Sequence, residues 1–134
     1  MVNLSSAAQM PVSRNALEGK SHISSQEAYA QSKLALTMWS FHLAKVHPEL
    51  NVIALNPGSL LNTNMVREAY GRFWSSADKG AKIIFGLATD TRYHKASGKY
   101  LDNDRGAFGQ AHQDAYNEKE VTSLIQETAR ILQA

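Results

Sequence analysis

Tyr29 and Lys33 stand four residues apart in a stretch that the sequence predicts to be helical. At that spacing, two side chains share one face of a helix. An ammonium group beside a phenol favours the phenolate form and therefore lowers the pKa of the phenol. Such a tyrosine gives or takes a proton near neutral pH, which an unperturbed tyrosine does poorly. The pair predicts general acid–base chemistry; the alternative is a core tyrosine beside a lysine that extends to the surface.

A strand–helix–strand order surrounds this pair and would position it. Residues 1–6 are short and apolar and end in two serines, as expected at the end of a buried strand. A helix is expected over residues 24–47, because residues 24–27 fit a capping box and Pro48 stops a helix. Residues 51–56 are almost continuously apolar, which indicates a strand buried on both faces. Together the three elements predict a right-handed βαβ unit with parallel strands.

The remaining segments extend the same α/β pattern. Residues 7–23 are polar and interrupted by proline and glycine, so we expect a loop there. The two-glycine stretch at Gly106 and Gly109 is also interpreted as a loop. Asp102, Asp104 and Arg105 are expected to form a solvated charged turn. The other expected elements are an irregular amphipathic stretch over residues 60–74 that would cover a site, a helix over 75–89, a strand over 98–101 and a final helix over 117–133.

Composition excludes several classes of protein. The 134 residues suit one domain with a sizeable core, and the net charge of +2 is too small to favour nucleic acid or a membrane surface as partner. There is no cysteine, which excludes disulfides, thiolate nucleophiles and cysteine-based zinc sites. The five histidines are dispersed, so no metal site is expected. No segment has the pattern of a membrane span or a signal peptide, so we expect a cytoplasmic protein.

The motifs together resemble those of the short-chain dehydrogenase/reductase family, over essentially all 134 residues. Three motifs carry the resemblance: the strand-end serine pair in residues 3–6, Tyr29-x-x-x-Lys33, and the turn at Pro57 and Gly58. Residues 32–36, and the long gap between Ser6 and Tyr29, look most like the retinol dehydrogenase and protochlorophyllide reductase side of the family. The resemblance implies an α/β fold, the C-terminal half of a doubly wound, parallel-sheet domain of the Rossmann type.

The family resemblance further implies hydride transfer between NAD or NADP and a small-molecule alcohol or carbonyl. In that family pattern Ser6 would hold the substrate oxygen, with Ser5 as the alternative position. Tyr29 would be the general acid or base, and Lys33 would lower its pKa and bind the nicotinamide ribose. The other residues implied at the cofactor are Pro57, Gly58 and Thr63, with Ser59 as a competitor for the role of Thr63.

The sequence lacks the part of the family fold that binds most of the cofactor. A dinucleotide needs a glycine-rich turn at a helix N-terminus, and neither G-x-x-x-G-x-G nor G-x-G-x-x-G occurs in these residues. We therefore expect a truncation, a proteolytic product or a split gene, without the part that binds pyrophosphate and adenosine. Such a chain would turn over little by itself.

The resemblance also implies a homo-oligomer that forms through the helices over 24–47 and 75–89. In the family pattern residues 60–74 would form the substrate lid, and their apolar and aromatic content indicates a hydrophobic substrate. A second function is a non-catalytic interaction module derived from the same fold, which the missing glycine-rich turn favours. A hydrolase that uses Ser6 is a weaker alternative, because no histidine and aspartate are arranged to suggest a triad.

Overall fold

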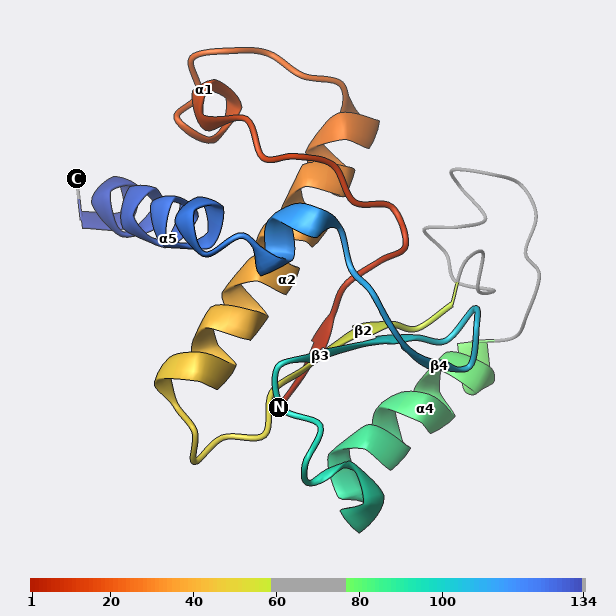
Figure 1. The fold of residues 1–134 in the computed structure, drawn as a ribbon. Helices are drawn as coiled ribbons and strands as arrows, with labels where there is room; N and C mark the ends of the chain where they lie inside the picture. Colours follow the sequence, from red (N-terminus) through yellow and green to blue (C-terminus); the bar gives the residue numbers. More distant parts are fainter. Residues whose placement is uncertain (59–76, 134) are drawn as a thin grey trace.

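A small sheet lies at the centre of the fold (Figure 1). The computed structural model describes residues 1–58 and 77–133. In this part of the chain, one sheet has the strand order β1-β2-β3-β4. The strands span Val2–Leu4, Ile53–Asn56, Lys99–Asp102 and Ala107–Gly109. β1, β2 and β3 are parallel, whereas β4 pairs antiparallel with β3, so the fold is α/β with a mostly parallel sheet.

The three parallel strands end at the same edge of the sheet. Leu4 of β1 is in register with Leu55 of β2, which is in register with Leu101 of β3. The residues that follow these leucines therefore meet at one edge, the place where open α/β sheets bind their ligands. β2 is buried at every position, as predicted for a strand that is covered on both faces.

α2, Ser25–Val46, covers one face of the sheet. It begins at the predicted capping box: the Ser24 hydroxyl accepts from the Glu27 N–H, and the Glu27 carboxylate accepts from the Ser24 N–H. It ends two residues before Pro48, because a residue that precedes proline is driven out of the helical region. The prediction of a helix over residues 24–47 is therefore confirmed, with Ser24 and His47 as its caps.

A hydrophobic cluster joins α2 to the C-terminal elements η2, Gln113–Tyr116, and α5, Glu118–Gln133. The buried members of this cluster are Leu34, Met38, Ala115, Val121 and Leu124. Leu34 has no exposed surface, and burying a leucine completely stabilises a fold by roughly 1.5–3 kcal/mol. Packing of this kind, more than helix propensity, holds α2 in its place.

α4, Ala77–Thr89, covers the opposite face of the sheet (Figure 1). The second hydrophobic cluster consists of Ile53, Leu55, Leu87, Ala96 and Leu101, with Ile83 and Ile84 packed against it. Side chains alternate along a strand, so the face of β2 that carries Ile53 and Leu55 turns away from α2.

Nothing in residues 1–58 and 77–133 forms a helix long and apolar enough to cross a membrane.

The sequence patterns did not predict two short elements. α1, Arg14–Leu17, interrupts the loop expected over residues 7–23, and it is capped by the Ser13 hydroxyl, which accepts from Ala16. β4 lies within the stretch interpreted as a two-glycine loop, and Gly106 enters it with a φ of 67°. Elements of three or four residues are too short to show a helical or strand period.

The bounds of the other elements differ from the expected ones by a few residues. β1 is shorter than the strand expected over 1–6, because the Ser5 N–H turns back to the Asn3 carbonyl at 3.0 Å. β2 begins at Ile53 because the Val52 N–H leaves the ladder and donates to the Ser97 hydroxyl. β3, α4 and α5 stand where strand 98–101 and helices 75–89 and 117–133 were expected, with residues 75 and 76 outside the described part.

An ionic network fastens α1 to α5. Arg130 of α5 pairs with Glu127, in the preceding turn, and with Glu18, which follows α1. Arg14 of α1 donates to the Ser123 hydroxyl on α5. The pKa of Glu127 is lowered from its ordinary value of 4.5 to about 2. Its hydrogen bonds from Arg130 are the largest cause, and its hydrogen bond with Glu18 is the next.

Glu127→Gln is expected to lower the thermal unfolding temperature slightly at neutral pH, because an amide attracts Arg130 less than a carboxylate does. A depressed folded-state pKa stabilises above about pH 4.5, and that contribution disappears as the pH falls to about 2. The difference from the wild type should therefore shrink over that interval, and also with added salt. Glu120→Gln on the same helix is the control. A difference that grows on acidification would contradict this account.

Candidate functional site

The carboxyl edge of the sheet gathers residues from three loops and from α2. Ser5 and Ser6 follow β1, Pro57 and Gly58 follow β2, and Asn103 and Asp104 follow β3. The contacts of Lys33 place the N-terminal half of α2 at the same edge. This edge is the candidate active site.

Lys33 links α2 to the end of β1. Its Nζ donates a 2.8 Å hydrogen bond to the carbonyl of Leu4, the last residue of the strand. The same Nζ lies 5.5 Å from the centroid of the Tyr29 ring, within the range of a cation–π contact. Tyr29 and Lys33 therefore share one face of the helix, as predicted. Lys33 joins that face to the residue before the serine pair.

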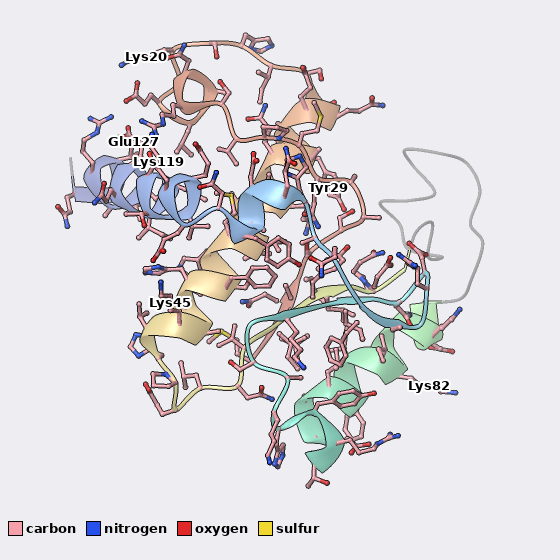
Figure 2. All side chains as sticks on the ribbon, in the orientation of Figure 1. Lys20, Tyr29, Lys45, Lys82, Lys119 and Glu127 are labelled. Atoms are coloured by element: carbon pink, nitrogen blue, oxygen red, sulfur yellow. The ribbon has the colours of Figure 1, made fainter. Side chains whose placement is uncertain are left out.

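Tyr29 is 37% exposed, and Figure 2 labels it on the N-terminal half of α2. Its hydroxyl makes no hydrogen bond to any residue that the structure describes. A phenol in this state can meet a ligand oxygen without first breaking a contact to the protein. The ammonium of Lys33 places a positive charge 5.5 Å from the centroid of that ring.

A row of polar contacts fixes how α2 lies along β1. The Ser40 hydroxyl accepts from Asn3 Nδ2 at 2.9 Å, and the hydroxyl oxygens of Thr37 and Ser5 are 2.6 Å apart. Lys33, Thr37 and Ser40 are spaced by four and three residues, so they form one stripe of the helix. These contacts set the register that brings Lys33 to the strand end. Polar residues in a helix are typical of an exposed face, so the sequence did not indicate that Thr37 and Ser40 are buried.

The two serines after β1 have different surroundings. Ser5 is 3% exposed, and its hydroxyl is held by Thr37. Ser6 is partly exposed, and its Oγ accepts a 3.1 Å hydrogen bond from the Ala8 N–H. Among the described residues no acceptor takes the Ser6 hydroxyl proton, so this proton is available to a ligand oxygen. The geometry favours Ser6 over Ser5 as the residue that holds a ligand oxygen.

Asn56 holds the turn that follows β2. Its side chain is 2% exposed, and Nδ2 donates to Asp102 at 2.9 Å and to Asp104 at 2.8 Å. Its Oδ1 accepts from the Gly58 N–H at 3.2 Å. Gly58 has a φ of 125°, which glycine adopts far more readily than other residues. Residues 103–106 form the predicted turn, and Asp104 and Arg105 are exposed in it. The sequence did not indicate that Asp102 and Asp104 also accept hydrogen bonds from a buried amide.

Two residues that the sequence patterns did not indicate contact Ser6. The Tyr100 hydroxyl donates to the Ser6 carbonyl at 3.1 Å, and Gln9 Nε2 donates to the same carbonyl at 2.9 Å. Tyr100 reaches Ser6 from β3, across the 94 residues that separate them in the chain. The one sequence feature that could have indicated Tyr100 is its type and place, a hydroxyl-bearing aromatic residue in a predicted strand beside the site.

Several predicted residues, and the other candidate sites, are not part of the candidate active site as the structure describes it. Ser59, Thr63 and the 60–74 lid lie outside the described residues. Two hollows of about 80 and 250 Å³ are lined by residues of α1, α2, η2 and α5 and their connections, and by none of the predicted catalytic residues. Within the described ranges, histidine and carboxylate side chains form no group of three or more that could hold a metal.

No protein-family model matches this chain, and no curated protein matches it. The function is therefore inferred from the chemistry of the residues. The site gathers a phenol, an ammonium group and a hydroxyl beside the ends of parallel strands.

Proposed function

We propose that this chain carries the catalytic groups of an NAD- or NADP-dependent oxidoreductase of the short-chain dehydrogenase/reductase family, which interconverts an alcohol and a carbonyl. One observation carries the proposal: Lys33 contacts both the Tyr29 ring and the Leu4 carbonyl, two residues before Ser6. The parallel strands with helices on both faces support the finer proposal of a doubly wound, Rossmann-type domain of which this is the C-terminal part.

In this proposal, each of three side chains has its own role in the reaction. In reduction, Tyr29 gives its hydroxyl proton to the carbonyl oxygen as negative charge develops there, and in oxidation it takes the proton back. Ser6 donates a hydrogen bond to the same oxygen and so stabilises its charge, as the donors of an oxyanion hole do. The charge of Lys33 stabilises the phenolate that Tyr29 becomes. Ser6 keeps its own proton throughout.

The described residues fit the nicotinamide end of the cofactor better than its phosphates. The Lys33 ammonium has three donors and gives one to Leu4, so others can bind ribose hydroxyls. Pro57 and Gly58 bring backbone to the same edge, and we assign Ser59 and Thr63 to the cofactor as well. The 134 residues contain no glycine-rich turn for the pyrophosphate. When bound, the nicotinamide supplies or accepts the hydride.

Transfer of deuterium tests the proposed reaction. The protein is incubated with a hydrophobic aldehyde and with NADH or NADPH that carries deuterium on one face of nicotinamide C4. Turnover is expected to be slow, because the 134 residues contain no glycine-rich turn for the pyrophosphate, so the product is collected after long incubation. Deuterium is expected at the new carbinol carbon from one labelled face and not from the other, as measured by mass spectrometry. Lack of transfer from both faces of both cofactors would contradict the proposal.

The two serines give a paired prediction. Ser5→Ala should lower the free energy of unfolding by about 1 kcal/mol, because it removes a buried hydrogen-bond partner of Thr37, and should change kcat little. Ser6→Ala should leave the unfolding free energy within about 0.5 kcal/mol and lower kcat by about 10²-fold, the worth of one oxyanion donor. Denaturant unfolding and steady-state kinetics measure both. Equal kinetic losses in the two variants would refute this division of roles.

A non-catalytic interaction module is the second candidate function, and exposed apolar side chains on two helices favour it. Trp39 and Val46 of α2 are 39% and 49% exposed, and Phe85 of α4 is 70% exposed. We propose that a homo-oligomer forms through these helices. Because α2 and α4 cover opposite faces of the sheet, their contacts to other copies must be separate.

Sedimentation velocity tests the oligomer, and a cofactor titration separates the two functions. The wild type should sediment as an oligomer and Trp39→Lys as a smaller species, whereas Leu132→Lys, at an 80% exposed position of α5, should change nothing. A monomeric wild type would contradict the oligomer.

A higher unfolding temperature with NAD(H) or NADP(H) supports the oxidoreductase, because a ligand stabilises the state that it binds. No response to either cofactor supports the module.

A further inference from the structure

The carbonyl of Ser6, in the loop after β1, receives two side-chain hydrogen bonds. Tyr100 donates from β3, and Gln9 donates from three residues further along the same loop. Ala54 of β2 is in register with both Asn3 and Tyr100, so its small side chain lies between β1 and Tyr100 on the same face of the sheet. The tyrosine side chain can therefore cross β2 and reach the end of β1.

Both donors are themselves held in place. Tyr100 is 4% exposed, and its burial, together with the charges of Asp102 and Asp104, raises the pKa of its phenol, so the hydroxyl keeps its proton and remains a donor. Gln9 Oε1 accepts from the His112 N–H at 3.0 Å, which leaves Nε2 directed toward Ser6. The two hydrogen bonds therefore fix the position of the peptide group of Ser6.

We propose that Tyr100 is a positioning residue for Ser6, with Gln9 as its second donor. The inference rests on the proposed function, in which the Ser6 hydroxyl donates to the substrate oxygen. A fixed Ser6 carbonyl holds the turn in which Ser6 Oγ accepts from the Ala8 N–H, and this contact leaves the hydroxyl proton available for donation. Tyr100 does not touch the substrate; it acts only through Ser6.

A double-mutant cycle tests this dependence. Tyr100→Phe should lower kcat by about 2- to 10-fold, the equivalent of one neutral hydrogen bond, with KM little changed. In a Ser6→Ala background, the same substitution should have no further effect on kcat, because the residue through which it acts is gone. Tyr93→Phe, whose hydroxyl makes no hydrogen bond within the described residues, is the control. An undiminished effect of Tyr100→Phe in the Ser6→Ala background would overturn the proposal.

Hydrogen exchange provides a readout that does not depend on turnover. Tyr100→Phe should speed exchange of the Ala8 amide several-fold relative to Tyr93→Phe, because the Ser6 turn is no longer pinned. Gln9→Met should do the same, and it serves where Tyr100→Phe fails to fold. Unchanged Ala8 exchange in both variants would overturn the proposal. If Ala8 exchange rises but Ser6→Ala and Tyr29→Phe leave catalysis unchanged, the proposed reaction fails while the pinning of Ser6 stands.

Discussion

Tyr29→Phe is expected to lower kcat by about 10² to 10⁴-fold, the usual contribution of a general acid or base. Phenylalanine keeps the ring and its contact with the Lys33 ammonium, so the substitution removes only the hydroxyl that carries the proton. Because Tyr29 is 37% exposed and its hydroxyl has no hydrogen bond within the described residues, the free energy of unfolding should change little. Loss of catalysis without loss of stability separates a chemical role from a structural one.

The matched control is Tyr116→Phe on η2. That hydroxyl accepts a 2.9 Å hydrogen bond from the Ala111 N–H and lies outside the candidate site. The control should therefore retain full kcat and lose a small amount of stability, the reverse of Tyr29→Phe. Steady-state kinetics and denaturant unfolding of both variants make the comparison. A Tyr29→Phe variant with the kcat of the wild type would end the proposal that this residue moves a proton.

Asn56→Asp is expected to destabilise the fold by about 3 kcal/mol or more. The amide of Asn56 donates to Asp102 and Asp104, and a carboxylate at the same position would lose both bonds and face two like charges. Like charges raise the pKa of the carboxyl groups in the folded state. The penalty should therefore be largest at neutral pH and should ease as the pH falls and one of the three groups takes a proton.

Asn117→Asp is the matched control for that substitution. Asn117 Oδ1 accepts from the N–H groups of Lys119 and Glu120 at the start of α5, where an aspartate accepts equally well. Its free energy of unfolding should stay within about 0.5 kcal/mol of the wild type. Urea unfolding at several pH values measures both variants. A stable Asn56→Asp variant at neutral pH would show that the Asn56 contacts do not hold this turn.

Local sequence signals were enough for the elements that carry the site. The bounds of α2 followed from its capping box and from Pro48, and the burial of β2 followed from its continuous apolar run. The shared face of Tyr29 and Lys33 followed from helical spacing alone. Each of these signals lies within a few neighbouring residues, which is the range over which a single sequence is informative.

The contacts that orient the site depend on residues far apart in the chain. Tyr100 meets Ser6 across 94 residues, and His112 meets Gln9 across 103, so no local pattern indicates either pair. The family resemblance favoured Ser6 with Ser5 as the alternative, and no local pattern separates two adjacent serines. The structure separates them by burial and by hydrogen bonding: Ser5 is buried against Thr37, whereas Ser6 is partly exposed.

A crystal structure of the protein with a nicotinamide cofactor and a carbonyl-bearing substrate analogue tests the central claim most directly. We predict that the hydroxyls of Tyr29 and Ser6 both lie about 2.6–3.2 Å from the one carbonyl oxygen of the analogue, at the carboxyl edge of β1 and β2. A Tyr29 hydroxyl turned away from that edge, or an analogue bound elsewhere on the molecule, would contradict the account.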